Sequence, residues 1–592
     1  MTSKKLIVLF FTIIVGLIYS LENILPYFWT KNTPGQVFTV FNGGDENLYA
    51  AQAREVYEGK LSGNAFIWET KNQPIFSNIF LPWLGTLFAG FLVRVFHSLD
   101  WTFVLGDFVF PGLIFILLVN LAYKLTNNFY GSITVGLATL FLSPVTTKLP
   151  PINMDMWQGL VNILTFHQSY QLIFSTLITR QLSFLIFVLF LFSLYFLFQK
   201  SLIWTIAAGM TAGILAYFYG YYWTTALVIL GAGMILAFLN RDYLLGRNLL
   251  IALLIALGVS SLFLINFYNN LLSDNHFLSG KIHGRFIEPL TTIRYGFFCL
   301  ISWYLLPKNK LRFLSMVTFL AAVILMNLQL LLGFSIDPGH WPNSVFEPLL
   351  VFFIGAIFFF LVKSRGFVKV LPLLIILFIG VNQFASAKEW LSFHQLSTTE
   401  NNLFNWLNKY AEPESVVLTL DKRISRYLPV ATAVNLYLPY GPFSQLSLDN
   451  IWLRIDLAFS ILGFQEEQIN QKLLDTQFVG QMFEQAYNYE QTDNLNNLDF
   501  PDSVKEEIKT KKPIFSLGLR YIPDNIKNEH NQVVKLLNKT ALKDRLCRYR
   551  LDYVLFTPKD KINMHKLDTN YFLPVFSEDS YSLYKLINGI CL

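Results

Sequence analysis

The sequence predicts a mainly α-helical protein: a polytopic transmembrane bundle of about 11 to 13 spans, followed by a C-terminal extracytoplasmic α/β domain. Its 592 residues are 54% hydrophobic and 16% aromatic but only 14% charged, whereas ordinary globular proteins have about 25% charged residues. The charges are also unevenly spread. Residues 1–388 hold 23 Lys and Arg against 14 Asp and Glu, and residues 389–592 hold 22 against 25. We therefore expect a membrane domain over 1–388 and a soluble domain over 389–592.

Apolar runs long enough to cross a bilayer, at about 20 residues each, recur through the membrane domain. The first, 6–25, follows Lys4 and Lys5 and has no small-residue cleavage site, so we expect a retained helix and not a signal peptide. The others are 104–123, 131–147, 182–198, 201–219, 222–239, 248–268, 291–306, 313–332, 345–362 and 369–387. The stretches 75–97 and 157–178 either lie in the outer interface, which gives about eleven spans, or both cross, which gives about thirteen.

The basic residues lie in short loops between the apolar runs and set the orientation, because such loops stay in the cytoplasm. The net charge of +6 is therefore a topology signal, not a nucleic-acid footprint. This orientation places an external loop, 26–103, and the soluble domain outside an expected plasma (inner) membrane. The cytoplasmic groups are Lys4 and Lys5; Arg241 and Arg247; Lys308, Lys310 and Arg312; and Lys363, Arg365 and Lys369.

The soluble domain alternates helical and strand patterns. We predict helices over 402–410 and 532–546 and strands over 415–420, 553–557 and 582–586. Three cysteines fix neither a disulfide framework nor a metal site. Cys547 and Cys591 can pair only if this domain lies outside the cell, where disulfides persist.

Two adjacent carboxylates, Asp45 and Glu46, follow the first span within Gly43-Gly44-Asp45-Glu46-Asn47-Leu48-Tyr49. They could simply begin a helix over 46–58, because acids are favoured at a helix N-terminus. With Ala53-Arg54-Glu55-Val56-Tyr57-Glu58-Gly59 behind it, however, the stretch resembles the first external loop of the GT-C membrane glycosyltransferases. That superfamily includes the protein O-mannosyltransferases and the aminoarabinose transferases that modify lipid A.

The resemblance implies transfer of a sugar from a polyprenyl-phosphate carrier to a lipid, glycan or protein acceptor at the outer membrane face, with no cofactor and no nucleic-acid partner. Such a transfer needs a base for the acceptor proton and cations for the leaving phosphate. The resemblance makes Asp45 the base and Glu46 a positioner or second acid. Gln73-Pro74 departs from the family, in which His or Lys often stands beside this proline.

Several cations of the predicted outer face could bind the donor phosphate: Arg180, Lys281, His283, Arg285 and His340, with Arg294 nearby in sequence. A cation at the outer mouth of a bundle is costly unless solvated or paired, which favours functional use. Each also has a simpler interpretation. Arg180 could extend to lipid headgroups, 281–285 could be a solvated loop, and Gly339-His340-Trp341-Pro342 could anchor the interface.

Asp155 has no acidic partner close in sequence, so we expect no metal. The main rival function is a transporter or flippase of lipid-linked sugars, which would carry charges within its spans near the midplane. The predicted spans are nearly free of acids, which favours a transferase. A scaffold whose soluble domain binds partners would leave Asp45 without a role.

Overall fold

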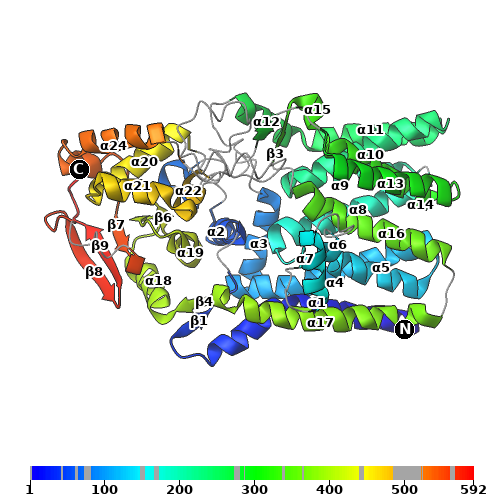
Figure 1. Cartoon of the computed structure of the whole chain (residues 1–592), viewed down its shortest axis with the longest axis horizontal. Coiled ribbons are helices and arrows are strands. Elements are labelled where there is room, and N and C mark those ends of the chain that lie inside the picture. Colours follow the sequence, from blue (N-terminus) through cyan, green and yellow to red (C-terminus); the bar gives the residue numbers. More distant parts are fainter. Residues whose placement is uncertain are drawn as a thin grey trace.

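The computed structural model describes residues 3–41, 45–60, 65–72, 82–146, 154–165, 172–199, 201–272, 281–283, 285, 287–336, 340–362, 366–438, 446–483, 522, 524–559 and 567–591. The chain forms an elongated body (Figure 1). A bundle of long helices holds the N-terminus, and a mixed helix and sheet region at the other end holds the C-terminus.

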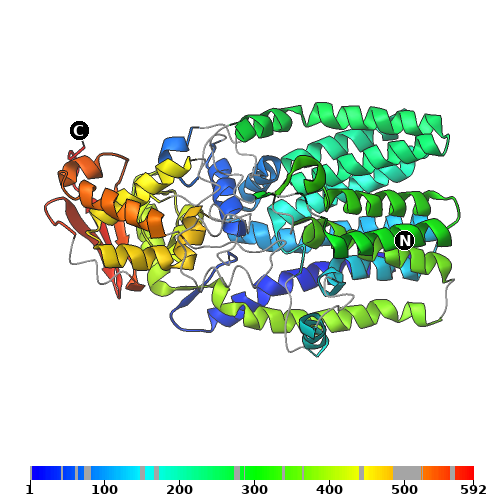
Figure 2. The ribbon, with the colours of Figure 1, turned by 45° about the horizontal axis from the view of Figure 1, so that its top comes forward.

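The long helices lie alongside one another, roughly along the long axis of the molecule (Figure 1 and Figure 2). Most are apolar around their whole circumference, as expected of helices that face lipid or one another. They are α1 (Ser3–Lys31), α4 (Leu99–Thr126), α5 (Phe129–Phe141), α8 (Leu182–Leu197), α9 (Leu202–Ile214), α10 (Gly220–Leu239), α11 (Tyr243–Val259), α12 (Ser261–Leu272), α13 (Pro289–Leu305), α14 (Lys310–Leu325), α16 (Glu347–Leu361) and α17 (Leu371–Glu389).

Every predicted apolar span overlaps a helix, but not all of these helices are long and apolar enough to cross a membrane. Within the described ranges seven do so, or eight if α11 and the start of α12, bent by 56° where they meet, form one span. Helix α5, helix α9 with its extension η4 (Leu215–Tyr217), and α3 (Trp83–Phe96) are shorter apolar helices. The structure therefore supports an integral membrane protein with seven or eight candidate spans, and a total of 11 to 13 stays a prediction.

Polar residues at the ends of apolar runs explain where several helices begin. The side chains of Ser98, Asn128, Asp242 and Asn309 each accept a hydrogen bond from a backbone N–H in the first turn of α4, α5, α11 and α14. Such caps satisfy donors that have no partner within the helix.

Helices α1 and α4 approach closely through a glycine. A Cβ atom added at Gly16 would lie 2.4 Å from the backbone oxygen of Phe108. Small residues allow this approach, which is a common way of packing membrane helices where no hydrophobic effect drives association.

Most of the shorter elements gather between the bundle and residues 389–592, which the sequence predicts to form a soluble domain (Figure 1). Helix α3 comes from the apolar stretch 75–97, and α7 from the stretch 157–178. Trp157, Val161 and Leu164 of α7 are exposed, as in a helix that lies in a membrane interface. The short elements of the membrane domain are α2 (Asp45–Tyr57), η1 (Trp68–Thr70), α6 (Ser143–Thr146), α7 (Met154–Leu164), β2 (Lys281–His283), α15 (Gln329–Leu332), β3 (Phe334–Ile336) and η6 (Gly366–Lys369).

Two helices of the bundle begin with a π-helical turn. The segment η3 (Leu177–Gln181) runs into α8, and η5 (Trp341–Phe346) runs into α16. π-Helical turns are rare in proteins, but those that occur are often found at functional sites. Arg180 lies within the first, and His340 directly precedes the second.

The soluble domain contains a five-stranded sheet with the strand order β6-β5-β7-β9-β8. Strands β6, β5 and β7 are parallel, and β9 is antiparallel to both β7 and β8. The register pairs Val417 with Tyr553 and Val554 with Tyr584. Its elements are η7 (Leu391–His394), β4 (Gln395–Ser397), α18 (Thr398–Tyr410), β5 (Val416–Leu418), α19 (Lys422–Ala431), β6 (Asn435–Leu436), α20 (Leu448–Ile461), α21 (Glu466–Leu474), α22 (Thr476–Phe483), α24 (Asp524–Leu537), α25 (Leu542–Leu546), β7 (Tyr553–Phe556), β8 (Phe572–Glu578) and β9 (Tyr581–Leu586).

All three predicted strands and the first predicted helix are present here as β5, β7, β9 and α18. The prediction of one helix over 532–546 is wrong in detail, because α24 and α25 are separated by a turn at 538–541. Helices α19 to α22 and strands β6 and β8 were not predicted. Most of these elements are short, with α20 the longest at 14 residues, and short runs give a weak periodic signal.

The segment 26–103, predicted to be an external loop, contacts the predicted soluble domain at several described points. Strand β1 (Gln36–Phe38) pairs with β4 in antiparallel register. Farther along, the Tyr427 hydroxyl donates to the Phe41 carbonyl at 2.7 Å, and the Leu436 N–H donates to the Phe66 carbonyl at 2.6 Å. The division at residue 388 stays a prediction, and extensive contacts cross it.

Glu414 binds two lysines of the same loop, which lie on either side of Phe66 in the sequence. Its carboxylate forms ion pairs with Lys60, at 3.0 Å, and with Lys71. Lys60 follows α2 and Lys71 follows η1, so both ends of the segment between them are tied to one carboxylate.

Cys547 and Cys591 form a disulfide. The sequence made this pairing conditional on an oxidising compartment. The bond joins the end of α25 to the last turn of the chain.

Candidate functional site

Helix α2 carries the acid pair. It begins at Asp45, so the two acids do start a helix, as the simpler interpretation expected. The side chain of Asp45 lies outside the described part of the structure. The side chain of Glu46 is described: its Oε1 accepts a hydrogen bond from the Leu177 N–H at 2.7 Å. This contact connects α2 to the π-helical turn η3.

Burial dominates the electrostatics of Glu46. Removal from water raises the pKa of its carboxyl to about 8, and repulsion by Glu22 acts in the same direction, whereas the Leu177 N–H and the Arg180 guanidinium lower it. At neutral pH the carboxyl therefore keeps its proton. A protonated Glu46 suits a positioning or acid role better than that of the general base.

Arg180 is positioned by η3. Its Nη1 donates to the Ile173 carbonyl at 3.1 Å, and its side chain is half-buried. The guanidinium interacts electrostatically with both Glu46 and Tyr222. Among the predicted cations whose side chains are described, Arg180 is the one shown to act on the charge of Glu46.

His340 lies in an aromatic cluster on the far side of Tyr222. Its Nδ1 is 2.6 Å from the Tyr219 hydroxyl, and its ring stacks on Tyr221 with centroids 4.9 Å apart. The Tyr219 and Tyr222 rings are 5.7 Å apart. Glu46, Arg180, the tyrosines and His340 thus form a continuous series of neighbours across the N-terminal ends of α8, α10 and α16.

Among the described side chains, Arg285 and Arg294 make contacts with other groups. Strand β2 pairs with β3, but the side chains of Lys281 and His283 lie outside the described part of the structure. Arg285 is exposed, and its Nη1 donates to the Leu330 carbonyl at 3.1 Å. Arg294 forms a two-pronged ion pair with the buried Glu347, at 2.5 and 3.1 Å.

The expectation that the spans are nearly free of acids needs correction. Glu22 of α1, Asp107 of α4 and Glu347 of α16 are all buried within helices of the bundle. Glu22 precedes the end of α1 by nine residues, and Asp107 follows the start of α4 by eight. At 1.5 Å per residue, Glu22 lies about 14 Å from the C-terminal end of α1, and Asp107 lies about 12 Å from the N-terminal end of α4.

Asp107 belongs to the same site as Glu46. Its Oδ2 accepts from Asn23 Nδ2 at 2.7 Å, and its Oδ1 accepts from Gln181 Nε2 at 2.5 Å. Glu22 and Glu46 interact electrostatically with it. Sequence reasoning missed this group, although an ionisable residue inside an apolar run is itself a signal of function.

Among the described residues, no group of three His, Cys, Asp or Glu is spaced to hold a metal ion. The side chain of Asp155, the metal candidate considered from the sequence, lies outside the described part, as do Gln73 and Pro74.

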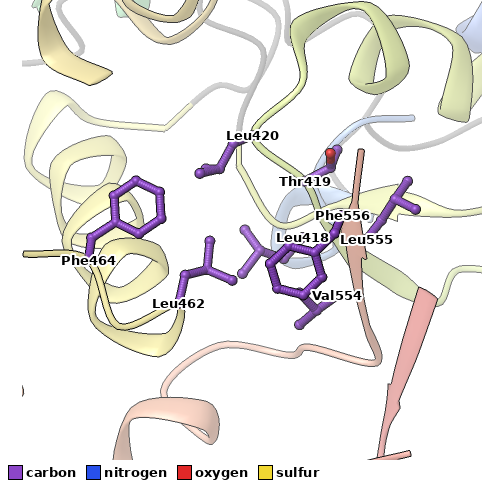
Figure 3. A pocket seen from close by; sticks show the side chains of 8 residues that line it. All are labelled: Leu418, Thr419, Leu420, Leu462, Phe464, Val554, Leu555 and Phe556. Atoms are coloured by element: carbon purple, nitrogen blue, oxygen red, sulfur yellow. The ribbon is translucent and has the colours of Figure 1, made fainter. Parts of the chain in front are cut away.

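A pocket in the soluble domain is separate from the acid site (Figure 3). It lies at the carboxyl ends of β5 and β7 and has a volume of about 10 Å³, room for about one water molecule. Ligand pockets usually measure about 300 to 1,000 Å³, and no titratable side chain lines this one. Its lining residues are Leu418, Thr419, Leu420, Leu462, Phe464, Val554, Leu555 and Phe556.

No protein-family model matches the chain, and no curated protein matches it. Among solved structures it is similar to the Archaeoglobus fulgidus oligosaccharyltransferase in its apo form, with 11% identity and a TM-score of 0.41. The similarity covers 98% of this chain and 74% of the archaeal one. Values this low do not establish a shared fold or activity, so the function proposed below depends on the residues of this chain.

Proposed function

We propose that this protein is an integral membrane glycosyltransferase of the GT-C type. It moves a sugar from a polyprenyl-phosphate carrier to a lipid, glycan or protein acceptor. The observation that carries the proposal is the hydrogen bond from Leu177 to Glu46. It joins the helix that begins with Asp45 to the π-helical turn that carries Arg180, at the membrane end of the external loop.

In the proposed reaction, Asp45 takes the proton of the acceptor hydroxyl. The hydroxyl oxygen then bonds to the anomeric carbon of the sugar, and the bond from that carbon to the carrier phosphate breaks. The phosphate leaves with the bonding electron pair, and Arg180 stabilises its charge. Glu46 positions the acid helix through Leu177, and His340 offers a further donor for phosphate or sugar oxygens.

We place the reaction at the outer membrane face. The basic loops expected in the cytoplasm lie at the opposite ends of the helices from α2. The disulfide of the soluble domain agrees with this orientation, because disulfides persist in oxidising compartments.

A transporter or flippase of lipid-linked sugars is the second candidate, and one observation favours it. Glu22 and Asp107 are buried acids within candidate membrane helices, where transporters carry their coupling residues. Their electrostatic interaction with Glu46, which belongs to α2 and not to the bundle, favours the transferase.

Transfer from a synthetic polyprenyl-phosphate sugar by the purified protein tests the proposal. Asp45→Asn keeps helix capping but cannot accept a proton, so transfer should fall by about 10² to 10⁴. Asp242→Asn is the matched control, because Asp242 is likewise an aspartate at the start of a helix but lies at the other end of the bundle. Near wild-type transfer by Asp45→Asn would remove the base assignment. A protein that moves the lipid-linked sugar across liposome membranes but never transfers it would identify a flippase.

A further inference from the structure

Helix α4 contacts the π-helical turn η3 at both of its ends. At the first end, Leu177 packs on Gly106, where an added Cβ would lie 2.9 Å from Leu177 Cδ1. At the last end, Asp107 Oδ1 accepts a hydrogen bond from Gln181 Nε2 at 2.5 Å. Gly106 and Asp107 are consecutive, so one turn of α4 holds the residues that begin and end η3.

The backbone of η3 follows an uncommon pattern between these two contacts. The Gln181 N–H donates to the Thr176 carbonyl at 3.0 Å, five residues earlier and not four. Helix α3 packs closely on the same turn, because a Cβ added at Gly85 would lie 3.0 Å from the Ile178 carbonyl oxygen. Tertiary contacts therefore fix η3 along its length.

Gln181 connects Asp107 to the backbone that positions Arg180. The same Nε2 of Gln181 donates to the Phe174 carbonyl at 2.9 Å. The neighbouring carbonyl, that of Ile173, accepts from Arg180 Nη1 at 3.1 Å. Two consecutive carbonyls are thus bound by two consecutive side chains, and a change in the position of one side chain reaches the other.

Asp107 is itself held in one orientation. Its second oxygen, Oδ2, accepts from Asn23 Nδ2 of α1 at 2.7 Å. Asp107 is 5% exposed and Gln181 is fully buried, so little water competes for these hydrogen bonds, and bonds in such surroundings are strong. The carboxyl group of Asp107 therefore joins α1 and α4 to η3.

We infer that Asp107 is a positioning residue for Arg180. It binds Gln181, and through Gln181 it fixes η3 and the backbone at 173–174, so that the guanidinium lies where it interacts with Glu46. Asp107 acts through these neighbours and touches no reacting atom. The inference rests on the proposed function, in which Arg180 binds the phosphate of the carrier.

Equilibrium binding of a polyprenyl phosphate to the purified full chain tests the inference with two variants of similar shape. Asp107→Leu accepts no hydrogen bond, so Gln181 is released, and donor affinity should fall by about tenfold. Asp107→Asn keeps one oxygen for Gln181. Its NH₂ group can donate to Asn23 Oδ1, which has no partner in the wild type, once the Asn23 amide rotates. Asp107→Asn should therefore bind the donor nearly as the wild type does.

A second comparison separates positioning from a general loss of structure. In an Arg180→Ala background, Asp107→Leu should cause no further loss of donor affinity, because no guanidinium is left to misplace. Asp242→Leu is the control, because it also removes a carboxylate that accepts a backbone hydrogen bond, but at the other end of the bundle. Its donor affinity should equal that of the wild type.

Gln181→Met keeps the length of the side chain but removes its donor, so it tests the same connection even if Asp107→Leu does not fold. It should also lower donor affinity by about tenfold, and only when Arg180 is present. Wild-type affinity in either of these variants would overturn the inference.

Two further outcomes would also overturn it. A loss in Asp107→Asn as large as that in Asp107→Leu would show that the charge itself is needed, and an equal loss with and without Arg180 would show a general structural role. Failure of the proposed function looks different. In that case the wild type does not bind the polyprenyl phosphate, or binds it equally well after Arg180→Ala, and the inference about Asp107 falls with it.

Discussion

The Leu177 N–H donates to Glu46 Oε1 at 2.7 Å across 131 residues of sequence. Leu177 opens the π-helical turn η3, and Glu46 lies in the first turn of α2. The bond gives the buried Glu46 carboxyl a partner. It also satisfies the Leu177 N–H, which lies at a helix start and therefore has no acceptor within its own helix. It also fixes the acid helix relative to Arg180, three residues after Leu177.

Glu46→Gln should remove a pH-dependent loss of stability. The pKa of Glu46 is raised from 4.5 to about 8 by burial. The folded state therefore binds more protons than the unfolded state between these values, and stability contributed by this group falls as pH rises through that window. Glutamine can still accept from Leu177 but has no proton to lose.

Thermal unfolding of the Glu46 variant is measured across this pH range at constant ionic strength. The variant should lose less stability than the wild type as pH rises to about 8. Glu467→Gln, at an exposed position in α21, should behave like the wild type. An unchanged pH dependence in Glu46→Gln would contradict the burial argument.

Arg180→Ala should weaken binding of a polyprenyl phosphate by about 1.5 to 3 kcal/mol, the range for a charged hydrogen bond. Sequence reasoning assigned Arg285 the same role, but Arg285 is exposed and donates to the Leu330 carbonyl, away from the described acid cluster. Arg285→Ala should therefore bind the donor as the wild type does. Equilibrium binding to the purified variants measures both. Equal losses of donor affinity in the two variants would support the sequence prediction that both arginines bind the phosphate. Unchanged affinity in both variants would show that neither arginine does so.

Gly16→Ala should destabilise the bundle. The added methyl group would lie 2.4 Å from the Phe108 carbonyl oxygen, so α1 and α4 must separate. Overpacking of this kind costs about 1 to 3 kcal/mol. Gly231→Ala in α10 is the matched control, because nothing lies within 4 Å of its added Cβ. Thermal unfolding in detergent compares them, and a Gly16 variant as stable as the Gly231 variant would contradict the close approach.

Cysteines placed at Thr33 and Asn525 should react with a membrane-impermeant thiol reagent in intact cells, because both positions are exposed and the basic loops predict that both lie outside. A cysteine at Asn240, exposed at the opposite end of α10, should react only after lysis. The experiment uses a Cys299→Ser background, since Cys299 is the free cysteine. Labelling of Thr33→Cys or Asn525→Cys only after lysis would reverse the orientation. Asn47, although next to the acid pair, is fully buried and unsuited to labelling.

The sequence alone determined the class of architecture. Apolar runs of about 20 residues predict membrane helices wherever they occur, because a helix in lipid satisfies its own backbone whatever its neighbours are. The strands β5, β7 and β9 follow from local alternation in the same way. The acid pair was also visible, since adjacent carboxylates beside a membrane span are unusual in any fold.

Only the tertiary structure decided which side chains meet. Sequence reasoning treated Arg180 and Arg285 alike, yet one interacts with Glu46 and the other binds a distant carbonyl. It overlooked Asp107, whose partners Asn23 and Gln181 come from two other helices, 84 and 74 residues away. The physical reason is that burial within a helix depends on the local pattern, whereas the partner of a buried polar group depends on how the helices pack against one another.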